Sequence, residues 1–311
     1  MNQILIGDSS KILERMESFG TKVNSCVTSP PYFGLRDYGI NNAVGTEETP
    51  AQYIERLVYI FSLVRKILCD DGSLWVVIGD SYASPKKNRT VAQATKKSTL
   101  GGALKTQCQV LRQQNKVVGA LKRKDLIGIP WMFAFAMRDS GWYLRQDIIW
   151  HKPNPMPESV KDRFTKSHEH IFLFTKKERY FFDNNAIKEN ARSGYRGSSF
   201  QKGKTKEARK HLSPVSENKR TETNYRNKRD VWTVATQPYK GEHFAAFPQK
   251  LIETCILAST RPGGIVLDPF MGSGTTAAVA KSHGRQYVGI EINPDYLSLI
   301  EKRIAKCEIV S

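Results

Sequence analysis

The sequence predicts an α/β fold with a doubly wound, mostly parallel sheet and two basic insertions. Apolar, strand-like runs alternate with helical patterns along most of the 311 residues, which is typical of parallel sheets covered by helices. The hydrophobic fraction of 40% is sufficient for one sizeable core. Two polar segments rich in lysine and arginine interrupt the alternation, and we expect them to project from this core.

Local patterns predict each element of the first half. Short apolar runs predict strands at 3–6, 23–28 and 73–78. A helix start is indicated by Thr49, Pro50 and Gln52, which supply an N-cap, a proline in the first turn and a capping-box partner. Apolar residues then recur at helical spacing as far as Leu68, and Asp71-Gly72 is expected to end this helix.

The second half continues the alternation. Helices are predicted at 130–138, 248–259 and 275–282, and a last helix is predicted after the cap formed by Asn293 and Pro294. Strands are predicted at 142–150, 171–174, 264–267 and 286–292.

Composition excludes several classes of protein. The chain has no apolar run of about 18 residues, so no transmembrane helix is expected. Its N-terminus lacks the pattern of a signal peptide. The five cysteines form no Cys-x-x-Cys pair and are odd in number, which argues against a disulfide framework or structural zinc. We therefore expect a cytoplasmic protein in a reducing compartment.

The formal net charge of +18 is concentrated in two segments. Residues 81–124 contain eleven basic and no acidic residues, and residues 185–229 contain thirteen basic and four acidic residues. The remainder of the chain therefore carries a charge of only −2. Two such segments around one core favour a nucleic-acid partner over solvated loops without a ligand, and Lys122, Arg123 and Lys124 are predicted phosphate contacts.

A glycine-rich turn in the C-terminal part predicts a nucleoside site. An apolar strand leads into Asp268-Pro269, and a helix is expected to begin just after Gly272 and Gly274. Glu291 follows at the end of the next predicted strand, where an acid can accept hydrogen bonds from ribose hydroxyls. The glycine spacing matches neither a dinucleotide motif nor a P-loop, which favours a nucleoside without a polyphosphate.

The segment Ser29-Pro30-Pro31-Tyr32 follows the predicted strand at 23–28. Two consecutive prolines end the strand and fix the backbone, so this turn is expected to be a stiff rim. The rim would present the Ser29 hydroxyl, the Pro30 carbonyl and the aromatic face of Tyr32. A loop with two prolines and no function is the ordinary alternative.

Six segments resemble the motifs of the amino-group DNA methyltransferases, in the order typical of the circularly permuted β group. Residues 29–32 are similar to the catalytic motif of that family, and residues 268–274 are similar to its S-adenosylmethionine motif. The other similar segments are Gly7-Asp8, Trp150–Pro157, His243–Pro248 and Glu291.

The resemblance implies a Rossmann-like methyltransferase sheet, S-adenosylmethionine as the cofactor and DNA with a flipped base as the substrate. The implied catalytic residues are Ser29, Pro30, Pro31 and Tyr32. The residues implied to bind the cofactor are Asp8, His243, Phe244, Phe247, Asp268, Pro269, Phe270, Gly272, Gly274, Thr275 and Glu291. The residues implied to line the base pocket are Trp150, His151 and Lys152.

The resemblance also divides the chain into five parts. Residues 1–80 would form the catalytic half of the α/β domain, 125–184 the base-pocket part and 230–311 the cofactor-binding half. Residues 185–229 correspond to the target-recognition region, whereas 81–124 carries no resemblance and is a candidate DNA contact. Both basic segments have a disorder-like composition, and we expect parts of them to order only on DNA.

The resemblance implies a direct methyl transfer. Tyr32 would stack on the flipped base while Ser29 and the Pro30 carbonyl accept hydrogen bonds from its exocyclic amine. The amine nitrogen would then attack the sulfonium methyl in line, without a covalent enzyme intermediate. C5-cytosine chemistry is disfavoured because no cysteine here follows a proline.

The target base and the wider function leave alternatives open. In this family Ser-Pro-Pro-Tyr usually accompanies N4-cytosine, so N4-cytosine is favoured and N6-adenine is the alternative. An RNA or protein-glutamine methyltransferase and an inactive DNA-binding module are less favoured. A host cell that is bacterial or infected by phage is expected, with a cognate restriction endonuclease as a candidate partner.

Three further features have ordinary explanations. His168-Glu169-His170 resembles a metal site, but no third ligand is evident, so we expect a loop leading into a core strand and no metal. Cys26 is expected to be a core residue on the strand at 23–28. Trp150 could pack within the core or line the base pocket.

Overall fold

The computed structural model describes residues 1–34, 43–84, 119–190, 225–236 and 247–308. These form two compact units, one made of residues 1–182 with 230–311 and the other of residues 183–229. The expected ordering of the insertions on DNA concerns residues 85–118 and 191–224, which lie outside the described residues. His243 and Phe244 also lie outside them.

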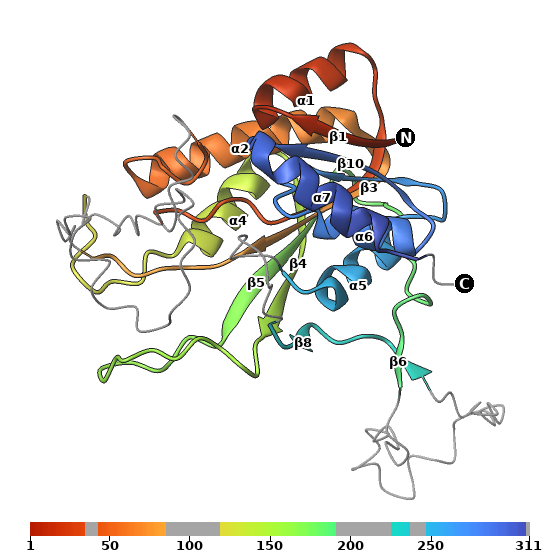
Figure 1. Ribbon diagram of the computed structural model, residues 1–311. Helices are drawn as coiled ribbons and strands as arrows, with labels where there is room; N and C mark the ends of the chain where they lie inside the picture. The colour runs from red at the N-terminus through yellow and green to blue at the C-terminus, as the bar shows by residue number, and fades with distance from the viewer. Residues whose placement is uncertain (35–42, 85–118, 191–224, 237–246, 309–311) are drawn as a thin grey trace, which may run out of the picture. The chain divides into compact units, whose positions relative to one another are not determined.

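The larger unit is built on an eight-stranded sheet in the order β1-β10-β9-β2-β3-β5-β4-β8 (Figure 1). In that order the strands span Asn2–Ile6, Gln286–Glu291, Ile265–Asp268, Val23–Thr28, Leu68–Ile78, His168–Thr175, Tyr143–His151 and Val231–Thr233. The first five strands are parallel, β5 is antiparallel to both β3 and β4, and β8 is parallel to β4. The prediction of a mostly parallel sheet is confirmed.

Two groups of helices cover the sheet (Figure 1). The first group comprises α1 (Ser9–Ser18), α2 (Pro50–Ile67) and α4 (Ile129–Asp139). The second comprises α5 (Gln249–Ser259), α6 (Thr275–Ser282) and α7 (Leu297–Ala305), which follows the short helix η3 (Pro294–Tyr296). On β2, Cys26 is fully buried in the core under the first group, whereas Ser25 hydrogen-bonds Thr260 after α5. The predicted doubly wound arrangement and the core position of Cys26 are confirmed.

Helix α2 begins as the sequence predicts but ends earlier. The Thr49 hydroxyl accepts the N–H of Gln52 at 3.2 Å, and the Gln52 side chain accepts the N–H of Thr49 at 3.1 Å. The predicted end at Asp71-Gly72 is wrong, because Leu68 already has extended dihedral angles and pairs with Val23 of β2. Hydrophobic spacing does not separate the last buried helical residue from the first buried strand residue.

Several elements have no counterpart in the sequence predictions. Helix α1 was not expected, and its N-cap is Asp8, whose carboxylate accepts the N–H groups of Ser10 and Lys11. Strand β8 was also not expected. No helix within the described ranges is long and apolar enough to cross a membrane.

The smaller unit contains a short antiparallel pair. Strand β6 (Glu189–Asn190) pairs with β7 (Tyr225–Arg226). The Glu189 carboxylate accepts hydrogen bonds from Arg226 and Arg229, both at 2.8 Å.

The sheet topology places many strand ends along one edge. The carboxyl ends of β1, β10, β9, β2 and β3 share this edge because these strands are parallel. Antiparallel β5 begins at the same edge, and β4 ends there. Side chains that are distant in sequence therefore meet at this edge of the sheet.

We expect Thr49→Ala to lower the free energy of unfolding by about 1 kcal/mol, because the capping box of α2 loses its hydroxyl acceptor. Urea unfolding followed by circular dichroism measures the change. The neighbouring exposed residue offers a control, since Glu48→Ala leaves the cap intact and should change stability by less than about 0.5 kcal/mol. Equal effects of the two substitutions would contradict the capping role.

Candidate active site at the carboxyl edge of the sheet

The Asp268 carboxylate joins the two halves of the larger unit. One oxygen accepts a hydrogen bond of 2.6 Å from the hydroxyl of Thr28, the last residue of β2. The other accepts the hydroxyl of Thr276 in α6, also at 2.6 Å, and the backbone N–H of Phe270 lies 3.0 Å from the first oxygen. Burial raises the pKa of Asp268 to about 6, while these hydrogen bonds act in the opposite direction.

The turn after β9 is fixed from several sides. The Ser9 hydroxyl donates to the Pro269 carbonyl at 2.5 Å, which ties the turn to α1. The Arg303 guanidinium of α7 donates to the Ser273 hydroxyl at 2.8 Å and also binds the Thr275 hydroxyl. Gly274 is the N-cap of α6. The turn is therefore a preformed part of the fold.

Glu291 lies at the end of β10, directly beside this turn. Its carboxylate accepts the backbone N–H of Gly272 at 2.8 Å and that of Asn293 at 2.9 Å. The residue is only 7% exposed, and burial raises the pKa of Glu291 to about 7 although both hydrogen bonds lower it.

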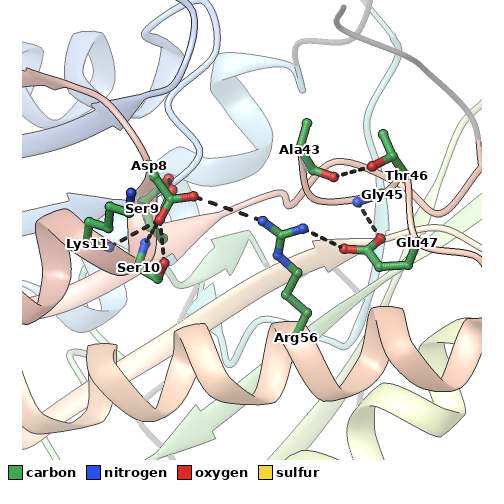
Figure 2. Close-up of polar contacts among 10 residues, drawn as sticks. Asp8, Ser9, Ser10, Lys11, Ala43, Gly45, Thr46, Glu47 and Arg56 are labelled. Carbon is green, nitrogen blue, oxygen red and sulfur yellow. Dashed lines mark hydrogen bonds and ion pairs between the residues drawn. The ribbon is translucent and has the colours of Figure 1, made fainter. Parts of the chain in front are cut away.

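Asp8 belongs to a polar network that reaches α2 (Figure 2). One of its oxygens caps α1, and the other lies 4.0 Å from the Arg56 guanidinium. Arg56 also donates to Glu47 at 3.3 Å. Partial burial would raise the pKa of Asp8, but hydrogen bonds from Ser10 and Lys11 and the charge of Arg56 hold it below its usual value. The Asp8 carboxylate is therefore ionised near neutral pH.

The segment Ser29–Tyr32 is held through its backbone. The Tyr53 hydroxyl of α2 donates to the Pro31 carbonyl at 2.9 Å. Gly45 packs on the other side with a φ of +93°, and a Cβ there would lie 3.0 Å from the Tyr32 carbonyl oxygen. The Gly45 N–H donates to Glu47 at 2.8 Å, so the network around Arg56 also supports this segment (Figure 2).

The Tyr32 side chain points to a charged pair from the antiparallel strands. Its hydroxyl donates to Glu169 of β5 at 2.8 Å, and the other Glu169 oxygen binds the Lys152 ammonium group. Burial and the negative Glu169 raise the pKa of Tyr32 well above its usual value, while the Ser29 side chain opposes this rise. The Lys152 ammonium lies 4.3 Å from the centre of the Trp150 ring.

The remaining base-pocket candidates lie at the end of β4. Trp150 is buried, and its indole N–H donates to the Val234 carbonyl at 2.8 Å. The His151 ring lies within hydrogen-bond distance of the Thr233 hydroxyl, at 3.2 Å. Trp150 thus packs in the fold and also supports Lys152 beside Glu169.

The first basic insertion leaves the sheet at this same edge. Residues 81–83 hydrogen-bond residues 124–127 in an antiparallel stem, which includes the bridge between Tyr82 and Leu126. Lys122 and Arg123 are exposed near the end of this stem, whereas Lys124 forms an ion pair with Asp162 at 2.5 Å.

The segment considered as a metal site has other partners. The His170 ring stacks on Phe172 and lies 3.0 Å from the Asp147 carboxylate, and Glu169 binds Tyr32 and Lys152. Residues 168–175 form strand β5, as expected for the core part of this segment.

The fold brings the predicted catalytic and cofactor segments together, because β2 and β9 are neighbours in the sheet. Phe247 is half-buried just before α5. The sequence predictions missed Tyr53, Arg56, Glu169 and Arg303. In the sequence, Glu169 is a single acid at the start of an apolar strand, a pattern that equally suits a metal ligand.

Comparison with known proteins gives consistent matches. A family model described as DNA methylase matches residues 23–302. The chain is 45% identical to the Type II methyltransferase M.Cfr9I of Citrobacter freundii, over 96% of this chain and 86% of that protein.

Solved structures with the same fold include PvuII DNA methyltransferase (cytosine-N4-specific), with a TM-score of 0.63 and 20% identity over 99% of this chain and 88% of that one. M1.HpyAVI in complex with S-adenosylmethionine has a TM-score of 0.54 and 17% identity, over 98% of this chain and 100% of that one. At these identities the two structures establish a shared fold.

We expect Glu291→Gln to change the pH dependence of stability. The pKa of Glu291 is about 7 in the folded protein and about 4.5 when unfolded, so ionisation destabilises the fold increasingly as pH rises from 4.5 to 7. The variant lacks this penalty. Its stability relative to wild type should therefore rise between pH 4.5 and 7.5 by an amount on the order of 3 kcal/mol.

Urea unfolding of both proteins at a series of pH values measures this difference. Glu301→Gln, at an exposed position of α7, serves as the control and should give a pH-independent difference. A constant difference between wild type and Glu291→Gln would show that Glu291 does not titrate in this range.

Proposed function

Because the chain belongs to the DNA methylase family, we propose that it methylates the exocyclic N4 of cytosine at a specific DNA sequence. S-adenosylmethionine is the methyl donor. We assign the chain to the permuted β group, since its catalytic segment at 29–32 precedes its cofactor segment at 268–275.

One observation carries this proposal. The Thr28 hydroxyl donates to the buried Asp268 carboxylate at 2.6 Å, so the residue before Ser29 is tied to the first residue of the cofactor segment. A nucleophile held at Ser29 and a methyl donor held at 268–275 would therefore lie at adjacent strand ends. Such proximity is a large source of rate acceleration in group transfer.

The donor set of the cofactor segment fits a nucleoside. Each oxygen of Glu291 accepts one backbone N–H, and a carboxylate has further lone pairs that can accept ribose hydroxyls. The ionised Asp8 would accept a hydrogen bond from the adenine amino group of S-adenosylmethionine. Pro269, Phe270 and Thr275 would complete the site, with His243, Phe244 and Phe247 covering the cofactor. When bound, the cofactor supplies an electrophilic methyl group on its sulfonium.

The other half of the site would position the base. The Tyr32 ring stacks on a flipped cytosine, a contact worth roughly 1–3 kcal/mol. The Ser29 hydroxyl oxygen and the Pro30 carbonyl accept hydrogen bonds from the exocyclic amine, which makes its nitrogen more tetrahedral and more nucleophilic. Trp150, His151 and Lys152, at the end of β4, are assigned to the surroundings of the base.

Cytosine is favoured over adenine because residue 29 is Ser, whereas the adenine enzymes of this group usually carry Asp or Asn in that position. The named specificity of the PvuII enzyme, which shares this fold, points the same way. N6-adenine methylation by the same residues is the alternative.

The relatives named as Type II methyltransferases support a place in bacterial restriction-modification. We accordingly propose host DNA as the substrate and a cognate restriction endonuclease as a partner. The basic segments 81–124 and 185–229 would contact the duplex, and the second would read the target sequence.

The identity of the methylated nucleoside tests this proposal. Duplex DNA, single-stranded DNA and RNA are incubated with the protein and methyl-labelled S-adenosylmethionine, and nucleosides are identified by mass spectrometry. N4-methylcytosine from duplex DNA is expected. Labelled N6-methyladenine would replace the cytosine assignment with the alternative, and label in RNA alone would remove the DNA assignment.

Tyr32→Ala should slow methyl transfer by about 10- to 100-fold, the cost of one base–aromatic stack, while the cofactor dissociation constant stays within about twofold. Single-turnover transfer and calorimetry measure the two quantities. Tyr143→Ala, at an exposed position of β4, is the control and should leave both unchanged. Equal loss of transfer and of cofactor binding would rule out the stacking role.

Replacing Lys122 and Arg123 by alanine should flatten the salt dependence of DNA affinity. Each lost phosphate contact lowers the slope of log K against log salt by about 0.9, so the double variant should lose up to about 1.8. Lys124 should contribute less because it is paired with Asp162. Lys66 lies in the last turn of α2, at the opposite edge of the sheet from the candidate site. Lys66→Ala is therefore the control and should not alter the slope. An unchanged slope in the double variant would mean that this pair does not touch phosphate.

A further inference from the structure

Glu169 is a partly buried acid whose role in the site is not explained by the family motifs. It is the second residue of β5 and pairs with Trp150 of β4. One oxygen accepts the Tyr32 hydroxyl at 2.8 Å, and the other binds the Lys152 ammonium. The Glu169 side chain is 15% exposed, so its two oxygens are largely removed from water and each has a protein donor.

The Tyr32 ring is also restrained along its edge. A Cβ at Gly79, just after β3, would lie 2.8 Å from Cε2 of Tyr32 and 3.3 Å from Cδ of Glu169. The backbone of β3 therefore packs directly against both side chains. The ring is held at two places, at its hydroxyl by Glu169 of β5 and at its edge by the backbone just after β3.

A tyrosine needs such restraint if its face is to receive a base. Rotation about χ1 moves the whole ring between staggered positions, so a ring whose outer end is not anchored can move away from the base. A misplacement of about 1 Å can slow a reaction by about 100-fold when the chemistry depends on alignment.

We propose that Glu169 is a positioning residue that fixes the outer end of the Tyr32 ring against the target base, with Lys152 holding the carboxylate in place. This inference rests on the proposed function, in which Tyr32 stacks on that base. Glu169 acts through Tyr32, whose hydroxyl donates to one of its oxygens while Lys152 binds the other.

A double-mutant cycle separates this role from a general structural one. Single-turnover methyl transfer to duplex DNA is measured for wild type, Glu169→Gln, Tyr32→Phe and the double variant. Each single substitution should slow transfer by about 10-fold, within the range expected for a misaligned reactant. The double variant should be no more than about twofold slower than the slower single variant, and the cofactor dissociation constant should not change.

Asp147→Asn is the matched control. Asp147 lies on β4 and hydrogen-bonds His170, the residue after Glu169, without a contact to Tyr32. It should leave the transfer rate unchanged. If the losses of the two single variants multiply in the double variant, or if Glu169→Gln weakens cofactor binding, the proposal is overturned.

A measurement that needs no activity completes the test. In protein labelled with ¹³C at tyrosine Cζ, Tyr32→Phe identifies the Tyr32 resonance. Glu169→Gln should shift that resonance and leave the other tyrosines in place, and an unshifted resonance would refute the contact. A wild-type protein that transfers no methyl to DNA refutes the proposed function, whereas the ¹³C resonance still decides whether Glu169 holds Tyr32.

Discussion

The rest of the site depends on the hydrogen bonds made by the buried carboxylate of Asp268. This carboxylate accepts hydrogen bonds from the hydroxyls of Thr28 and Thr276 and from the backbone N–H of Phe270. Thr28 and Asp268 are 240 residues apart in the chain, so this contact joins its first and last parts. A carboxylate that is 2% exposed is stable only where such donors offset its lost hydration. Thr28 belongs to β2 and Asp268 to β9, so these hydrogen bonds hold the ends of the two strands together.

The other residues of the site lie on either side of β2 and β9, along the same edge of the sheet. On the parallel side, α1 and β10 present Asp8 and Glu291 near the turn after β9. On the antiparallel side, β5 and β4 present Glu169 and Lys152 to Tyr32. In the proposed function the first group binds the nucleoside cofactor and the second binds the base. The Ser29–Tyr32 segment follows β2, which lies between β9 and β3 in the sheet.

Local sequence patterns predicted elements best where hydrogen bonds are local. The capping box at Thr49 and both ends of α6 appear as expected, because caps and turns depend on residues a few positions apart. The predicted end of α2 was wrong because Leu68 is buried, and a buried leucine fits the last turn of a helix as well as the first position of a strand. Helix α1 was missed because only Leu13 and Met16 among its apolar residues are buried, too few for a clear periodic signal.

The sequence alone determined the chemical groups of the site and their order along the chain, because a Ser-Pro-Pro-Tyr turn and a glycine turn after Asp268 need only neighbouring residues. The tertiary structure alone decided which strands are adjacent, and therefore that Thr28 meets Asp268 and that Tyr32 meets Glu169. Strand order follows from burying the faces of all strands and helices at once. That requirement belongs to the whole fold, and no window of the sequence contains it.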